Sequence, residues 1–197
     1  MPTRPRLLAF AGSTRRDSFN KKLVAIAAAG ARAAGADVTV ADLREFPMPI
    51  YDGDLERENV GGLPPEAKRW KALLIEHQGL LISSPEYNSS ISGVLKNAID
   101  WATRPEPNEP PLVAFKGKVA ALMAASPGNL GGLRGLVTVR SILGNIGVIV
   151  LPDQVTVPSA SEAFDADGGL KDASLSAKVE RLGKTLASVV ARLSVPE

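Results

Sequence analysis

Two adjacent arginines lie in a short polar stretch, "FAGSTRRDSFNKKL", at residues 10–23. The stretch follows an apolar run and opens a helical pattern, so its free backbone N–H groups and the helix dipole favour an anion. Its side chains offer the hydroxyl, guanidinium and amide donors that suit a phosphate monoester: Ser13, Thr14, Arg15, Arg16, Ser18 and Asn20. We expect at most one of the two arginines to touch such a ligand. In the alternative interpretation, the loop is solvated and Asp17 or Ser18 simply caps the helix.

Two common nucleotide-binding motifs do not occur in this loop. It lacks the lysine-Ser/Thr pair of the GxxxxGK[ST] loop, and no GxGxxG fingerprint follows the apolar run. The anion interpretation therefore depends on the donors and their position alone.

A second polar stretch, "SSPEYNSSISGVLKNAIDWATRP" at residues 83–105, also joins an apolar run to a helical pattern. Pro85, Gly93 and the small residues give an exposed backbone that can face a planar heterocycle. Tyr87 and Asn88 add an aromatic face and an amide. In the alternative interpretation, Tyr87 is an ordinary loop residue, Trp101 is a core or subunit-contact residue, and Lys96 is a solvated helix residue.

The elements that must position both loops are apolar runs alternating with helical patterns. Apolar runs predict strands at residues 6–12, 79–87, 117–126 and 147–157, and an alternating apolar pattern predicts one at 36–43. Helices are predicted from Phe19 onward and at 64–77, 92–103, 132–146 and 174–193. The alternation indicates an α/β doubly wound parallel sheet, whose first and third strands adjoin, so that their outgoing loops form two walls of one crevice. In the first helix, small residues such as Gly30 would allow close packing on the sheet. Long loops at 43–65 and 104–111 are predicted to bind a ligand or another subunit.

Composition narrows the protein class. The 197 residues, 45% of them hydrophobic, suit one domain spanning 1–197. The 23 basic and 21 acidic residues are interspersed, which argues against a nucleic-acid partner. Without cysteine, the chain has no disulfide, CxxC motif or thiol nucleophile, so any redox chemistry needs a cofactor. We expect a soluble, cytoplasmic protein without a signal peptide or membrane span.

Three motifs in order resemble the NADPH-dependent FMN reductase family, which includes flavodoxin-like quinone and chromate reductases. They are "GSTRRDSFN" (12–20), "PEYNSSISGVLKNAIDW" (85–101) and "ASPGNLGG" (125–132). The resemblance, over about residues 6–157, implies a five-stranded sheet of order 2-1-3-4-5 between two helical layers. It also implies an FMN cofactor with NADPH or NADH as co-substrate.

The resemblance further implies which residues hold FMN. The phosphate would lie against Ser13, Arg15, Ser18 and Asn20, and Phe19 would also contact the cofactor. The isoalloxazine edge would meet the backbone of Pro85, Glu86, Tyr87 and Asn88, with Ile91 or Gly93 nearby, and Ser126 and Gly128 would face the ring or ribityl chain. Family members are homodimers or homotetramers, with the helix at 92–103 near the contact. The proline-rich "RPEPNEPPLVAF" segment departs from the family pattern.

No protein residue is expected to be catalytic, because flavin N5 carries the hydride chemistry. We expect His77 at the surface and Glu86 to act through its backbone. No metal site is expected.

The leading functional hypothesis is NAD(P)H-dependent reduction of a small acceptor, such as a quinone, with ping-pong kinetics. The alternatives are a reductase that releases reduced FMN to a monooxygenase and a flavodoxin-like electron carrier. Candidates to pair with the 2′-phosphate of NADPH are Arg16, Lys21 and Arg104.

Overall fold

The computed structural model describes residues 4–58 and 62–193, in which five parallel strands form one sheet of order β2-β1-β3-β4-β5. The strands are β1 (Arg6–Ala11), β2 (Asp37–Asp42), β3 (Gly79–Ser83), β4 (Val119–Ala125) and β5 (Ile149–Val157). Because the order reverses between β1 and β3, the loops leaving these two strands open onto one crevice at the carboxyl edge. The predicted sheet and its strand order are confirmed.

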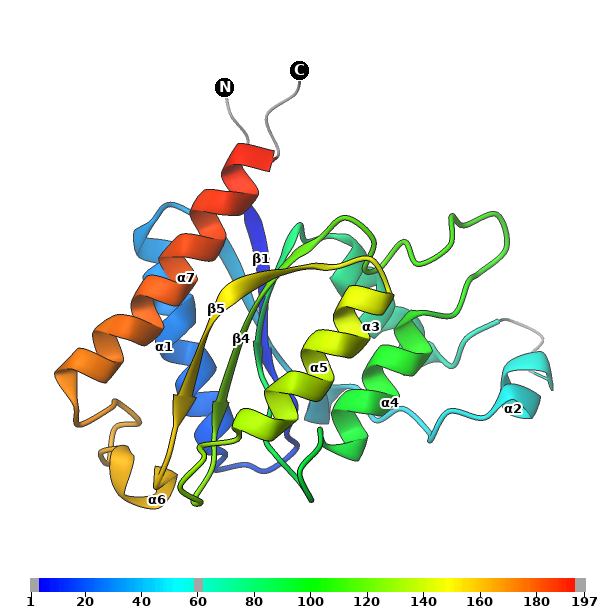
Figure 1. Ribbon diagram of the computed structural model, residues 1–197. Helices are drawn as coiled ribbons and strands as arrows, with labels where there is room; N and C mark the ends of the chain where they lie inside the picture. Colours follow the sequence, from blue (N-terminus) through cyan, green and yellow to red (C-terminus); the bar gives the residue numbers. More distant parts are fainter. Residues whose placement is uncertain (1–3, 59–61, 194–197) are drawn as a thin grey trace.

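Helices cover both faces of the sheet (Figure 1). On one face lie α1 (Phe19–Ala33) and α7 (Ala173–Leu193), and on the other α3 (Pro65–Ile75), α4 (Gly93–Ala102) and α5 (Leu133–Asn145). Helix α1 begins at the predicted Phe19, and the other four begin and end within two residues of their predicted bounds. Three short helices in the described part of the chain were not predicted: a 3-10 helix at Leu43–Glu45, α2 (Gly53–Glu58) and α6 (Ala160–Ala163).

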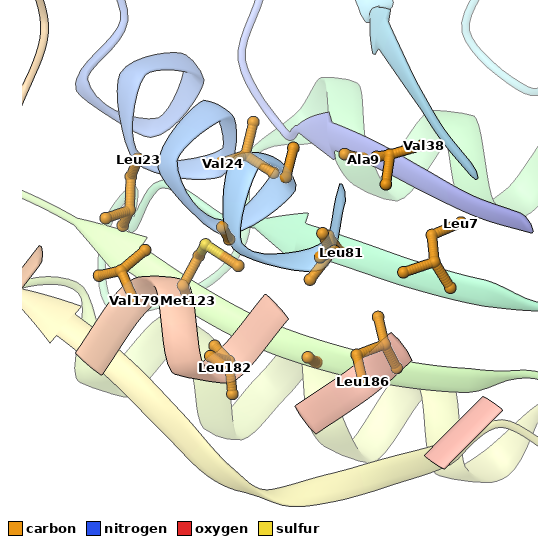
Figure 2. Close-up of a cluster of buried hydrophobic side chains, with 14 of the residues drawn as sticks. Leu7, Ala9, Leu23, Val24, Val38, Leu81, Met123, Val179, Leu182 and Leu186 are labelled. Carbon is orange, nitrogen blue, oxygen red and sulfur yellow. The ribbon is translucent and has the colours of Figure 1, made fainter. Parts of the chain in front are cut away.

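The core has two halves because successive side chains of a strand point to opposite faces of the sheet. In β1, Leu7 and Ala9 face α1 and α7, whereas Leu8 and Phe10 face the other helical layer. Figure 2 shows the first half, where Leu182 and Leu186 of α7 meet the sheet. The central strands β1, β3 and β4 are buried on both faces and have the continuous apolar sequences from which they were predicted, whereas the edge strand β2 has the alternating pattern expected of it.

Helices α1 and α7 cross at very short range. A Cβ atom added to Gly30 would lie 2.2 Å from the carbonyl oxygen of Glu180, and one added to Gly183 would lie 1.9 Å from that of Ala27. The small residues of α1 were expected to allow close approach to the sheet. The glycine instead serves the contact with α7, since only a residue without a Cβ fits there.

The segment after β2 is fixed along α4 before it reaches α2 (Figure 1). The carbonyl oxygen of Pro49 accepts hydrogen bonds from Asn97 Nδ2 (2.9 Å) and Trp101 Nε1 (2.8 Å). Asn97 Oδ1 accepts one from the N–H of Tyr51 (2.8 Å). Trp101 is buried with Leu63 and is thus a core residue. Residues 59–61 of the predicted 43–65 loop lie outside the described residues.

The proline-rich segment is fixed by a buried lysine of α3. Lys71, 2% exposed, donates to the carbonyl oxygen of Arg104 (2.7 Å) and forms an ion pair with Glu109. The segment predicted as a loop is thus tied to the helical layer.

The expected surface position of His77 is wrong. The residue is 2% exposed, with Nδ1 of its ring 2.7 Å from the carbonyl oxygen of Leu73 and Nε2 2.8 Å from Thr39 Oγ1. Nearby, the buried Lys118 donates to the carbonyl oxygens of His77 and, at 3.5 Å, Ile75. Within residues 4–58 and 62–193, no carboxylate forms an ion pair with Lys118. Both residues pack at the amino edge of the sheet, because His77 lies between α3 and β3 and Lys118 directly precedes β4.

Candidate functional site

The first loop joins β1 to α1 at the carboxyl edge of the sheet. Ser13 and Ser18 are each 3% exposed, whereas Arg15 and Arg16 are exposed. Ser13 Oγ accepts a hydrogen bond from the N–H of Arg15 (3.3 Å), which leaves the hydroxyl proton available for another acceptor. The guanidinium carbon of Arg15 lies 5.9 Å from the centre of the Phe19 ring, so this arginine lies over the start of α1.

The amino end of α1 lacks a side-chain cap. Ser18 occupies the N-cap position in an extended conformation, but its hydroxyl makes no cap hydrogen bond, and no acidic residue lies in the first turn. Asp17 forms an ion pair with Lys22 instead (2.6 Å). The alternative interpretation, in which Asp17 or Ser18 caps the helix through its side chain, is therefore wrong. An uncapped helix start with buried hydroxyls suits an anion.

Asn20 connects the first loop to the middle of the sheet. Its Oδ1 accepts from Ser83 Oγ (2.8 Å) and from the N–H of Ala125 (3.0 Å), and its Nδ2 donates to the carbonyl oxygen of Ala125 (2.9 Å). One amide hydrogen remains for a ligand. Asn20 thus fixes the start of α1 against the ends of β3 and β4.

The second loop contains a tight two-residue turn. Strand β3 ends at Ser83, earlier than the predicted 87, because Pro85 supplies no N–H for a ladder. Tyr87 and Ser90 exchange backbone hydrogen bonds of 2.9 and 3.0 Å around Asn88 and Ser89, which have φ values of 51° and 66°. Non-glycine residues rarely adopt this left-handed conformation. The turn exposes half of Tyr87 at the rim of the crevice.

The third loop leaves β4 and turns sharply toward α5. The N–H of Gly128 donates to Ser126 Oγ (3.3 Å), and the N–H of Ser126 donates to the carbonyl oxygen of Val157 (3.1 Å). The loop therefore lies between the ends of β4 and β5.

The three loops converge on one small pocket of about 50 Å³. Its lining includes every predicted site residue except Asn88 and Gly128: Ser13, Arg15, Ser18, Phe19, Asn20, Pro85, Glu86, Tyr87 and Ser126, together with Ala125 and Pro127. The last two were not predicted as site residues, because neither apolar side chain carries a chemical signal. Their positions on either side of Ser126 in the sequence were the signal that could have identified them.

The side chain of Glu86 is engaged, which the prediction of a backbone role did not include. Its Oε1 accepts from Nε (2.8 Å) and Nη2 (2.5 Å) of Arg134. Although burial acts to raise the pKa of Glu86, hydrogen bonds from the Arg134 guanidinium and the Gly135 N–H hold it below its ordinary value. The carboxylate is therefore ionised at neutral pH.

Two larger cavities lie along α4, one of which adjoins the first loop at Thr14. One, of about 380 Å³, is bounded by Thr14 and Arg44, and the other, of about 490 Å³, by Ile50 and Tyr51. Both are also lined by Met48, Val94 and Asn97, so they form one groove, here called the α4 groove. Ile50 beside it is 85% exposed.

The donors present fit FMN at both ends. Buried hydroxyls and an arginine at an uncapped helix start match a phosphate dianion. The exposed turn at Tyr87 and the apolar Pro85 and Pro127 match a flat, partly apolar ring. Among the described residues, no group of three or more His, Asp or Glu side chains is placed to hold a metal ion. None of the described helices is long and apolar enough to cross a membrane.

A parallel sheet of order 2-1-3-4-5 with polar loops at its switch point defines the flavodoxin-like class. The NADPH-dependent FMN reductase family matches residues 5–162, and the chain belongs to this family. It is 38% identical to an NAD(P)H-dependent FMN reductase of Pseudomonas aeruginosa over 168 residues, 85% of each chain. It is 32% identical to a 2-hydroxy-1,4-benzoquinone reductase of a Burkholderia species over 160 residues, 81% of each chain.

Among solved structures, the chain resembles the flavoenzyme NAD(P)H:(acceptor) oxidoreductase of Paracoccus denitrificans. The TM-score is 0.76 at 27% identity, with 95% of this chain and 98% of the other covered. The predictions of the family, the flavodoxin-like fold, an oxidoreductase activity, FMN and NAD(P)H are confirmed.

Proposed function

We propose that this chain, acting over 1–197 as one FMN-binding domain, passes electrons from NAD(P)H through bound FMN to a quinone. The observation that carries the proposal is the convergence of the three loops on one pocket at the switch point of the sheet. The quinone reductases among its relatives support this class of acceptor. Chromate and other small xenobiotic oxidants are further acceptors within the proposal.

Each group of site residues has a distinct part in this proposal. Ser13, Arg15, Ser18 and the free amide hydrogen of Asn20 would hold the phosphate, with Phe19 beneath Arg15. The backbone from Pro85 to Asn88 would meet the ring edge, with Ser126 and Gly128 on the opposite wall. When bound, FMN supplies a centre that accepts a hydride and returns two electrons. The protein binds and orients the cofactor.

The test is an absorbance spectrum after adding FMN and desalting, followed by anaerobic NADPH and then a quinone. Retained flavin absorbance that NADPH bleaches and the quinone restores is expected, with parallel double-reciprocal plots in steady state. Retained absorbance that NADPH does not bleach would instead favour the electron-carrier alternative. Intersecting plots would contradict a ping-pong sequence.

The shallowness of the pocket favours a second candidate, release of reduced FMN to a monooxygenase. Arg15 and Tyr87 at its two ends are both exposed, so the enclosing contacts are few. Dialysis under reducing conditions separates the two: loss of flavin with full turnover in excess FMN would support release.

The remaining parts of the proposal concern the surroundings of the site. We place the protein in the cytoplasm, where NAD(P)H is supplied, with no nucleic-acid or membrane partner. A homodimer or homotetramer is supported by the α4 groove, whose apolar rim at Ile50 is exposed in the single chain. Of the three candidate partners of a 2′-phosphate, Lys21 pairs with Asp42 and Arg104 with Glu56, which leaves Arg16 as the candidate.

A further inference from the structure

Helix α5 begins without a capping side chain of its own. Its N-cap residue is Gly132, with φ 91°, so no local hydroxyl or carboxylate can accept the free N–H groups of the first turn. The carboxylate of Glu86, from the loop after β3, accepts them instead. Its Oε2 lies 2.9 Å from the N of Arg134 and 3.1 Å from the N of Gly135. A distant loop thus caps this helix.

The second carboxylate oxygen of Glu86 ties the same loop to the Arg134 side chain. With four hydrogen bonds, the Glu86 side chain is only 7% exposed, whereas Arg134 is 57% exposed. A carboxylate at a helix start is favoured by the dipole, and a charge-assisted bond strengthens it. The pair therefore fixes the direction in which the backbone leaves Pro85.

The turn is also packed closely against α5, so that a side chain at Gly135 would require its neighbours to shift. A Cβ on Gly135 would lie 3.2 Å from the carbonyl oxygen of Ser90 and 3.4 Å from the Cβ of Glu86. On its other side, Ser92 Oγ donates to the carbonyl oxygen of Gly12 at 2.6 Å. The second loop is thus held between the first loop and α5.

We propose that Glu86 and Arg134 are positioning residues that hold the turn at 85–90 in the orientation that receives the ring of FMN. The proposal rests on the FMN site proposed above. Because the Glu86 carboxylate occupies the start of α5, that helix cannot attract the phosphate. The uncapped start of α1 can, so the two helix starts together give the cofactor one orientation.

The test compares FMN with riboflavin, which lacks the phosphate, by flavin-fluorescence titration of the apoprotein. Glu86→Ala should weaken both ligands by the same factor, about ten-fold, because the loss is on the ring side. Arg15→Ala should weaken FMN alone. Glu180→Gln, which removes an ion pair with Lys184 on α7, is the matched control and should change neither affinity.

Two conservative variants separate positioning from general stability. Glu86→Gln keeps an acceptor for the helix N–H groups but loses the ion pair, so it should recover part of the riboflavin affinity lost in Glu86→Ala. Arg134→Gln removes the guanidinium and leaves the cap. The midpoint potential of bound FMN should rise in Glu86→Gln, because this variant removes a negative charge near the ring. It should fall in Arg134→Gln, because this variant removes a positive charge there.

Several results would overturn the inference. One is a folded Glu86→Ala protein with wild-type affinity for both ligands, and another is a loss confined to FMN. If Glu86→Ala does not fold, the Arg134→Gln variant provides the test. Unchanged affinities for both flavins and an unchanged midpoint potential of FMN in that variant would refute the positioning role. Wild-type protein that binds neither flavin would overturn the proposed site itself, and the positioning role with it.

Discussion

Arg15 and Arg16 are both exposed, but only Arg15 lies over Phe19 at the start of α1. We predict that Arg15→Ala weakens FMN binding by about 10- to 150-fold, the effect of losing a hydrogen bond of about 1.5–3 kcal/mol to a charged group. Fluorescence titration measures this change, and Arg16→Ala is the matched control. Damage by the Arg16 variant alone would mean that the phosphate lies against the other arginine.

The phosphate itself should supply much of the affinity. Riboflavin is expected to bind wild-type protein far more weakly than FMN, because the hydroxyls of Ser13 and Ser18 then lose their anionic partner. Competition between the two flavins in one titration gives the ratio. Equal affinities for the two flavins would contradict the hypothesis that the uncapped start of α1 binds the phosphate.

Lys118 should make stability depend on pH in the alkaline range. Burial lowers the pKa of Lys118 to about 8, from 10.5 for the exposed side chain. Between these values the unfolded chain holds more protons, so the free energy of unfolding should rise with pH, by at most about 1.4 kcal/mol per pH unit. Urea unfolding at several pH values measures the slope. Lys118→Met should flatten it, and parallel slopes in the two proteins would refute the prediction.

Individual residues were predicted from sequence where their chemistry is local. Ser13 and Arg15 were predicted because hydroxyls and a guanidinium directly follow a strand, and both line the pocket. The carboxylate of Glu86 could not, because its partners are backbone N–H groups 48 and 49 residues away. A signal did exist: the Gly131-Gly132 pair before α5 leaves that helix without a cap. The burial of His77 could not be predicted either, because its partner Thr39 is 38 residues away in the sequence and lies beside it only in the fold.

At the scale of elements, the crossing of α1 and α7 depends on two glycines. We expect Gly183→Ala to destabilise the protein by about 1–3 kcal/mol or more, because its methyl group would overlap the Ala27 carbonyl oxygen. Thermal unfolding provides the measurement. Gly144→Ala on the exposed face of α5, where the added carbon meets no atom within 4 Å, is the control and should stabilise by up to about 1 kcal/mol.

The strands and long helices were predictable because burial imposes a pattern on the sequence. A strand covered on both faces is continuously apolar, and a helix on a sheet has one apolar face. The segment after β2 has no such pattern: α2 has no fully buried residue, and Pro49 is held by side chains of α4. Its path therefore depends on tertiary hydrogen bonds that no local pattern encodes.

At the scale of the molecule, the α4 groove should determine the oligomeric state. We predict that Ile50→Asp lowers the mass in solution toward that of one chain, 20.6 kDa, because a charge at an apolar rim opposes association. Light scattering after size exclusion gives the mass. Ile149→Asp, at an exposed position on the edge strand β5, is the control. An unchanged mass for Ile50→Asp would place the contact elsewhere.

The candidate site and the ends of the fold lie at opposite edges of the sheet (Figure 1). Strand β1 starts, and α7 ends, at the amino edge, where Val190 of α7 packs beside Gly79. A second protein or a solid support joined through either end would therefore leave the pocket facing outward. This arrangement makes the chain suitable for immobilisation on an electrode, or for fusion to a second enzyme, without rebuilding the pocket.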